Sequence, residues 1–158
     1  MRPPARLLGV DLGERRIGLA VADLDDGTGH TGARSLAVLR RGSLEQDVTR
    51  IARLVDEQGV TGLVVGLPRN MDGSEGAQAA ATREWAAQVA ARLALPLAWR
   101  DERLTSEAAE ASLPRTRRGR AGGPPSAAAR GRRRAAVDRE AARLILQAEL
   151  DARSGAGS

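Results

Sequence analysis

The chain has 158 residues, a formal net charge of +5 and no cysteine. This length fits one domain around one core, so we expect a single domain over residues 1–158. The lack of cysteine excludes disulfides and thiolate metal sites, and no apolar run is long enough for a membrane span or a signal peptide. The expectation is therefore a cytoplasmic protein without a membrane partner.

The whole positive excess lies in one segment. The 25 basic residues are all arginine, and eight of them fall between Pro114 and Arg134, a stretch without any acidic residue. In the rest of the chain 17 arginines are outnumbered by 20 Asp and Glu residues, which leaves a net charge of −3. A basic patch on a weakly acidic body indicates a polyanionic partner.

The N-terminal part of the chain predicts a hairpin, a third strand and a helix. Apolar runs separated by a glycine turn predict the strands: Arg6–Leu12, Arg16–Asp23 and Ala33–Arg40. Ser43 and Gln46 then match a capping box. Apolar residues at helical spacing continue the helix to a stop at Gly59.

The second half predicts two more strands that alternate with helices. The strands are expected at Thr61–Gly66 and Pro96–Arg100, and the helices at about Gly76–Leu95, Ser106–Leu113 and Val137–Ala152. Low complexity predicts that the basic segment 114–134 is mobile, and residues 153–158 are expected to form a flexible tail. A meander followed by helix–strand crossovers predicts an α/β fold, with a mixed five-stranded sheet flanked by helices.

Three acidic residues occupy positions that favour a site. Asp11 lies inside an apolar strand, where an ionised carboxylate is costly unless it is paired or binds metal, although it could simply cap the turn at Gly13. Glu102 follows the fifth strand, where α/β sheets form their sites, or it belongs to a solvated charge cluster with neighbouring arginines. Asp138 begins the predicted last helix, where the helix dipole alone favours Asp.

Together, three carboxylates suit metal-dependent phosphodiester hydrolysis. Two divalent ions about 3.5–4 Å apart activate a water and stabilise the leaving oxygen, and such ions prefer oxygen ligands. The sequence lacks the residues that other hydrolytic mechanisms need. There is no cysteine nucleophile, and the single histidine, His30, lies in a Gly-rich loop typical of a solvated side chain. We predict that Asp11, Glu102 and Asp138 are the catalytic residues and bind Mg²⁺ or Mn²⁺.

Basic and polar residues near these acids are predicted to contact the substrate: Arg16, Asn70, Arg103, Arg130, Arg132, Arg133 and Arg134. The loop around Asn70 could equally be an ordinary turn, and the arginine segment could be a passive linker. We favour phosphate binding by that segment because it directly precedes Asp138. Trp85 and Trp99 could stack on bases, but an apolar helical stripe makes Trp85 more typical of a core residue.

Four motifs in this order resemble the YqgF (RuvX-like) family, bacterial proteins similar to Holliday-junction resolvases and described as pre-16S ribosomal RNA nucleases. The motifs are Gly9–Gly13 with Arg16–Asp23, Gly66–Pro68 with Asn70–Gly73, Asp101–Thr105, and Val137–Asp138 with Ala141–Ala142. The resemblance covers about Arg6 to Leu150. It implies a ribonuclease-H-like fold, a role in maturing the 5′ end of 16S rRNA, and an acidic site on Asp11, Glu102 and Asp138.

Several functions remain open from the sequence. The first is the rRNA-processing nuclease, and the second is a junction-resolving DNA endonuclease, which shares its chemistry but acts as a symmetric dimer. We expect a monomer or weak homodimer. The third is a catalytically silent RNA-binding module, which retention of all three acids disfavours. An ATPase of the actin and sugar-kinase type also uses an Asp-x-Gly turn, but it needs two such domains, and this chain is too short for both.

Overall fold

The computed structural model describes residues 5–24, 32–101 and 126–156, which hold five strands and three helices. The strands are β1 (Arg6–Leu12), β2 (Arg16–Asp23), β3 (Arg34–Arg40), β4 (Gly62–Leu67) and β5 (Leu97–Asp101). The helices are α1 (Leu44–Gln58), α2 (Ala77–Leu93) and α4 (Ala127–Ala156). Among these residues no helix combines the length and the apolar character needed to cross a membrane.

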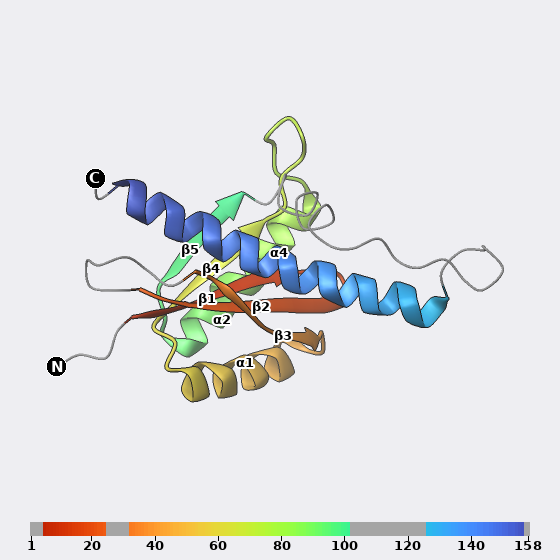
Figure 1. Cartoon of the computed structure of the whole chain (residues 1–158), viewed down its shortest axis with the longest axis horizontal. Coiled ribbons are helices and arrows are strands. Elements are labelled where there is room, and N and C mark those ends of the chain that lie inside the picture. Colours follow the sequence, from red (N-terminus) through yellow and green to blue (C-terminus); the bar gives the residue numbers. More distant parts are fainter. Residues whose placement is uncertain (1–4, 25–31, 102–125, 157–158) are drawn as a thin grey trace.

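The strands form one mixed sheet in the order β3-β2-β1-β4-β5, with β1 at its centre. The pairs β1–β2 and β2–β3 are antiparallel, whereas β4 is parallel to both β1 and β5. Helices α1 and α2 cover one face of this sheet and α4 covers the other (Figure 1). The predicted five-stranded sheet with helices on both faces is therefore confirmed.

Local sequence signals explain most of the element boundaries. The β1–β2 turn is closed by a 2.8 Å hydrogen bond from the Gly13 N–H to the carbonyl of Arg16. The predicted capping box is present at α1, where Ser43 and Gln46 each accept from the other's backbone N–H, at 3.2 and 3.0 Å. Gly59 ends that helix with a φ of 68°, a left-handed conformation that glycine adopts without a Cβ clash.

The predicted start and end of the last helix were wrong. It was expected over Val137–Ala152, but α4 spans Ala127–Ala156, so residues 127–134 of the basic segment and 153–156 of the tail are helical. Ser126 caps the new start, because its Oγ accepts a 3.1 Å hydrogen bond from the Ala129 N–H. Alanine and arginine are strong helix formers, which explains a helix in this low-complexity stretch. The predicted helix at Ser106–Leu113 lies outside the described residues.

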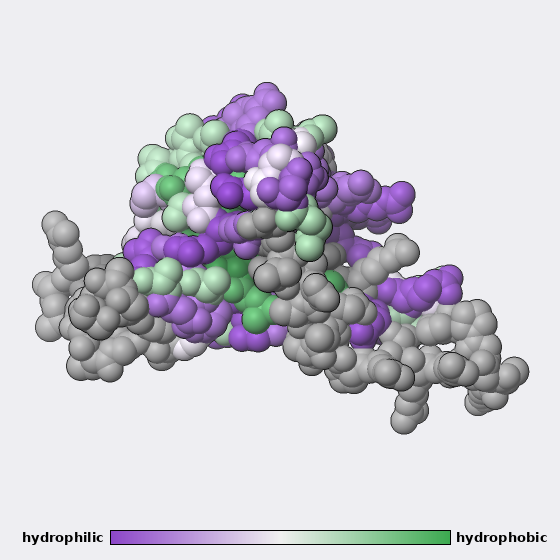
Figure 2. Space-filling view, turned by 90° about the horizontal axis from the view of Figure 1, so that it is seen from above, coloured by the Kyte–Doolittle hydropathy of each residue, from purple (hydrophilic) through white to green (hydrophobic). Residues whose placement is uncertain are grey.

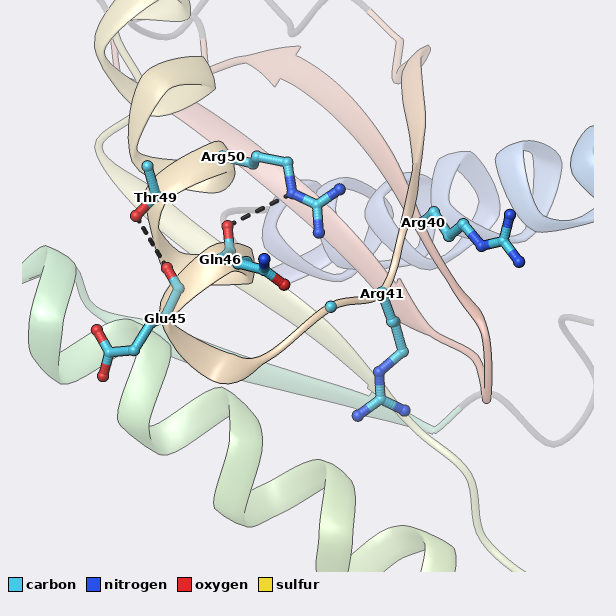
Figure 3. Close-up of a pocket in the computed structure, with 7 residues that line it drawn as sticks. Arg40, Arg41, Glu45, Gln46, Thr49 and Arg50 are labelled. Atoms are coloured by element: carbon cyan, nitrogen blue, oxygen red, sulfur yellow. Dashed lines mark hydrogen bonds between the residues drawn. The ribbon is translucent and has the colours of Figure 1, made fainter.

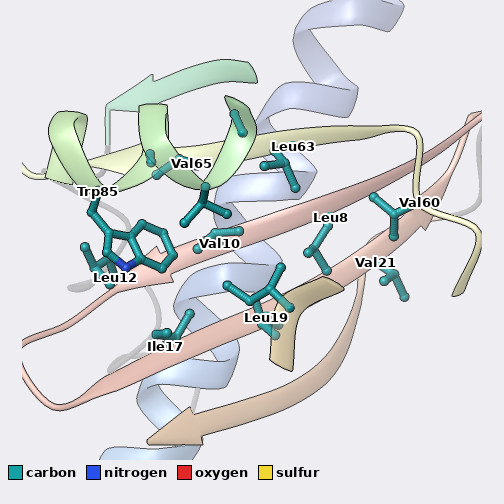
Figure 4. Close-up of a cluster of buried hydrophobic side chains, with 14 residues drawn as sticks. Leu8, Val10, Leu12, Ile17, Leu19, Val21, Val60, Leu63, Val65 and Trp85 are labelled. Atoms are coloured by element: carbon teal, nitrogen blue, oxygen red, sulfur yellow. The ribbon is translucent and has the colours of Figure 1, made fainter. Parts of the chain in front are cut away.

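Alternating side chains of β1 separate two cores. Leu8, Val10 and Leu12 point toward α1 and α2, where they join the larger cluster shown in Figure 4. Leu7 belongs to the smaller cluster under α4. On that same face a Cβ added to Gly9 would lie 2.8 Å from the Cβ of Leu146, so α4 packs directly on the backbone of β1.

The indole of Trp85 belongs to the core, as its place on an apolar stripe of α2 predicted. Only 8% of Trp85 is exposed, and it packs in the larger cluster with residues of β1. Its Nε1 donates a 3.3 Å hydrogen bond to Asp47, which is 1% exposed. This contact ties α2 to the first turn of α1.

Candidate active site at one edge of the sheet

The carboxyl ends of the three parallel strands meet at one edge of the sheet. Val10 of β1 pairs with Val65 of β4, and two residues further along, Leu67 pairs with Asp101 of β5. The end of β4 therefore lies between the end of β1 and the end of β5. In α/β sheets this edge, and the loops that follow it, is where sites form.

Asp11 is the second-last residue of β1 and lies on this edge. It pairs with Gly18 of β2 and is partly exposed, in contrast to the buried residues on either side of it. Strand alternation places it on the α4 face, together with Gly9. The neighbouring turn is closed by the backbone bond at Gly13, which accounts for the turn without the Asp11 carboxylate.

The helix turn that carries Asp138 lies beside the same end of β1. The Gln147 side chain accepts a 2.9 Å hydrogen bond from the Ala33 N–H, just before β3, and β3 starts at the same end of the sheet as β1. The Ala142 carbonyl lies 3.0 Å from a Cβ built on Gly9. The helix thus runs from the carboxyl end of β1 toward its amino end. Asp138 precedes Ala142 by one turn, on the same side of the helix.

The position of Asp138 in α4 removes one alternative interpretation. The helix begins at Ala127, so Asp138 stands in its interior rather than in its first turn. The helix dipole, which acts within the first turn, therefore gives no reason for an Asp here. Its side chain lies outside the described part of the structure.

Glu102 lies outside the described residues, immediately after the last residue of β5. Arg100, the second-last residue of β5, pairs with an acid of α4. Its Nε donates a 2.7 Å hydrogen bond to Glu149, which also accepts a hydrogen bond from Arg153. Burial, the largest single influence, raises the pKa of Glu149, but the hydrogen bonds and positive charges of Arg100 and Arg153 together outweigh it and hold the pKa below its usual range. This pairing fastens α4 to the end of β5.

Asn70 shapes the loop that follows β4. Its amide donates a 3.0 Å hydrogen bond to the Ser74 Oγ, and Ser74 in turn donates to Asp72. Gly73 has a φ of 88°, which completes a tight turn. The contact is structural, and a role of Asn70 in substrate binding stays a prediction. Figure 1 shows this loop projecting from the edge of the sheet.

An arginine also covers one of the two tryptophans. The guanidinium of Arg83 lies 5.0 Å from the centre of the Trp99 ring and makes an ion pair with Glu75 at 2.6 Å. The hydrogen bond from Arg83 lowers the pKa of Glu75. Trp99 therefore stacks on a cation of its own chain.

The predicted substrate-binding arginines divide between two places. Arg130, Arg132 and Arg133 lie in the first turns of α4, whereas Arg16 begins β2. The structure adds Arg40, which the sequence analysis missed: the strand register sets it directly opposite Arg16. Arg103 and the side chain of Arg134 lie outside the described part. On the face shown in Figure 2, hydrophilic described residues (purple) lie among apolar ones (green).

Within residues 5–24, 32–101 and 126–156, no three acidic or histidine side chains gather as a metal site. The predicted ligand set reaches beyond these residues, because it includes Glu102 and the side chain of Asp138. What the described part contributes is one carboxylate, Asp11, and the backbone positions that lead to the other two.

Comparisons with known proteins agree with this architecture. Residues 5–152 match the model of a family described as "RuvX: Holliday junction resolvase". A "Putative pre-16S rRNA nuclease" from Paramagnetospirillum magneticum is 41% identical over 150 residues, covering 95% of this chain and 88% of the relative. One of the same name from an Anaeromyxobacter species is 44% identical over 149 residues, covering 94% and 98%.

Solved structures share the fold at low sequence identity. The RuvC structure from Thermus thermophilus superposes with a TM-score of 0.53 at 14% identity and covers 95% of this chain and 96% of that one. The same protein in complex with a Holliday junction substrate gives 0.54 at 14% identity, with 96% of each chain covered. The ribonuclease-H-like fold that the resemblance implied is thereby confirmed.

Proposed function

This chain belongs to the RuvX family, and we propose that it is a metal-dependent nuclease that processes the 5′ end of pre-16S rRNA. The relatives that are 41% and 44% identical over nearly the whole chain are named pre-16S rRNA nucleases, which supports the RNA substrate. The observation that supports the proposal is the arrangement at one end of the sheet. Asp11 and the strand end that leads into Glu102 lie on strands separated only by β4, and α4 packs on Gly9 of β1 one turn after Asp138.

The acidic set fits a hard divalent cation. Asp11 is a carboxylate in a strand that is otherwise buried, at a position partly open to solvent. All three proposed ligands supply oxygen, which Mg²⁺ and Mn²⁺ prefer. When bound, the metal would supply activation of a water and stabilisation of the leaving oxygen.

The chain's own residues hold these ligands in place. Asp11 gains rigidity from the central strand, which pairs on both sides. The Arg100–Glu149 pair fastens α4 to β5 about three helical turns after Asp138. We expect this anchor to limit movement of the helix turn with Asp138. The exposed arginines at the start of α4 would bind backbone phosphates and orient the RNA toward the acids.

A second candidate is cleavage of branched DNA. The description of the family model as a Holliday junction resolvase supports this second candidate. Resolution of a two-fold symmetric junction needs two symmetric active sites, and therefore a dimer. A protein that stays monomeric at the concentrations of the cleavage assay would argue for RNA processing.

The test is a cleavage assay with two substrates, a pre-16S rRNA fragment and a four-way DNA junction, each with Mg²⁺ or Mn²⁺. We expect the wild type to cut the RNA at its 5′ side and Asp11→Asn to leave it intact. Asp56→Asn, an exposed residue on α1 away from the edge, is the matched control and should cleave normally. Cleavage of the DNA alone would favour the second candidate, and cleavage of neither would contradict the proposed nuclease.

A measurement without catalysis tests the metal site. Clustered carboxylates repel each other, and a bound divalent ion relieves that repulsion and stabilises the folded state. Mg²⁺ or Mn²⁺ should raise the melting temperature of the wild type and of Asp56→Asn, but not of Asp11→Asn. Equal shifts in all three proteins would contradict metal binding at Asp11.

A further inference from the structure

Four arginines surround the tip where β2 begins and β3 ends. Arg16 and Arg40 are directly opposite each other in the β2–β3 register. Arg41 follows β3, and Arg50 comes from α1. We refer to these four residues, Arg16, Arg40, Arg41 and Arg50, as the tip cluster.

Two arginines of the tip cluster, Arg40 and Arg41, have no carboxylate partner within the described part of the chain. The Arg40 side chain is exposed and forms no hydrogen bond or ion pair there. Arg41 Nη1 donates a 2.9 Å hydrogen bond to the carbonyl of Gly13, which is a neutral partner. Glu45, an exposed acid on α1, is already paired with Arg92. Arg50 pairs with the buried Asp47 at 3.2 Å.

A shallow hollow lies at the tip cluster. It is lined by Arg40, Arg41, Gln46, Thr49 and Arg50, among other residues. Figure 3 shows Arg50 reaching from α1 and Arg41 extending from the segment after β3, while Arg40 extends away from α1. Cationic groups thus approach the tip from both faces of the sheet.

The tip cluster flanks the candidate active site. Arg16 lies two residues before Gly18, the strand partner of Asp11, and alternation puts Arg16 on the same face of the sheet as Asp11. Diagonal neighbours of this kind are about 7–8 Å apart. Arg41 contacts the carbonyl of Gly13, two residues after Asp11. A nucleic-acid strand bound at Asp11 would therefore pass the tip cluster.

We propose that the tip cluster binds backbone phosphates of the nucleic-acid substrate beside the cleavage site, as an anchor separate from the arginines of α4. The proposal rests on the proposed nuclease function. Its ligand is the phosphodiester backbone that RNA and DNA share, so the experiment includes one probe of each kind.

The test measures salt-dependent binding in an Asp11→Asn background, which prevents cleavage. The probes are a fluorescent pre-16S rRNA fragment and a four-way DNA junction. Arg40→Ser is compared with Arg34→Ser, an exposed arginine at the opposite end of the same strand, and Arg40→Lys keeps the charge. Removing one phosphate contact lowers the log–log salt slope by about 0.7–0.9, roughly a threefold smaller salt effect between about 50 and 200 mM.

We expect this loss of slope for Arg40→Ser with at least one probe, no loss for Arg34→Ser, and the wild-type slope for Arg40→Lys. Melting temperatures equal to that of the parent show that the variants are folded. Equal slopes for Arg40→Ser and Arg34→Ser would overturn the tip cluster as an anchor while leaving the nuclease proposal intact. Failure of the parent to bind either probe at low salt would instead contradict the proposed function itself.

Discussion

The two faces of the sheet are built differently. On the α1/α2 face, the side chains of β1 are large and aliphatic, and the polar groups that are buried there, such as Asp47, are hydrogen-bonded. On the α4 face the same strand presents Leu7, Gly9 and Asp11, and α4 rests on its backbone over a smaller apolar cluster. The comparison indicates that the α1/α2 face serves stability alone, while the α4 face combines packing with a partly open carboxylate.

The largest expected effect separates these two roles with one substitution on each face of β1. Asp11→Asn should abolish cleavage and leave the free energy of unfolding unchanged or raised, because in the proposed site it removes one of three like charges. Leu8→Ala, on the other face, deletes a fully buried side chain and should cost about 2–5 kcal/mol. Cleavage assays and urea unfolding of both variants provide the measurement.

The division of roles would be wrong if Leu8→Ala abolished cleavage under conditions where it is fully folded. It would also be wrong if Asp11→Asn unfolded the protein. The first result would mean that the α1/α2 face also contributes to activity, and the second that Asp11 contributes to stability.

The next effect concerns how closely α4 approaches β1. Gly9→Ala would put its Cβ 2.8 Å from the Cβ of Leu146 and 3.0 Å from the Ala142 carbonyl, so the helix must move. Overpacking of this kind typically costs about 1–3 kcal/mol. Because the same helix carries Asp138, we expect cleavage to fall as well. Urea unfolding and cleavage rates measure the two effects.

Gly131→Ala is the matched control within α4. A Cβ at Gly131 meets nothing within 4 Å, and alanine is the better helix former by about 0.8–1 kcal/mol. This variant should be more stable than the wild type and cleave normally. A loss of stability similar to that of Gly9→Ala would contradict the close packing of α4 on β1.

A comparable effect is expected at the polar contact inside the α1/α2 face. Asp47 accepts hydrogen bonds from the Gly42 N–H at 2.9 Å, from Arg50 and from the Trp85 indole. Asp47→Ala leaves the buried indole N–H without its acceptor, which costs about 1–3 kcal/mol. Urea unfolding should show this loss, and Asp56→Ala, exposed on the same helix, should not. A cleavage rate that fell more than the folded fraction would show that the two faces are coupled.

The sequence predicted the α1/α2 face well because its signals are local. Apolar runs mark β1 and β2, and the Ser43–Gln46 capping box with Gly59 marks both ends of α1. The start of α4 was missed because its arginines and alanines were taken as low-complexity linker. Two prolines followed by Ser126 were a usable helix-start signal in that stretch.

The candidate site was predicted only in part, for a physical reason. Asp11 was identifiable as a charge inside an apolar strand, and it lies at the expected sheet edge. The importance of Arg40 depends on which residue faces it, and the β2–β3 register that pairs it with Arg16 is not readable from the sequence. The interior position of Asp138 was also missed, because the start of its helix was predicted at Val137, ten residues after its actual start at Ala127.

The smallest expected effect is the pH dependence that Glu149 gives to the α4 face. Arg100 and Arg153 both donate 2.7 Å hydrogen bonds to its carboxylate, and its folded pKa is lowered from 4.5. A lowered folded pKa contributes stability that is present above the unfolded pKa and is lost as pH falls through the folded value. Wild type should therefore lose stability below about pH 4.5, and Glu149→Gln should lose less over the same range.

Glu140→Gln, an acid on the same helix that pairs with Arg143, is the comparison for that titration. Urea unfolding from pH 3 to pH 7 measures the stability of all three proteins. Because Glu149 is 6% exposed and joins α4 to β5, its protonation should also loosen the helix that carries Asp138. If Glu149→Gln kept the full acid dependence of the wild type, the Arg100–Glu149 pair would not be what fastens α4 to the active edge, and the two faces would differ less than the packing indicates.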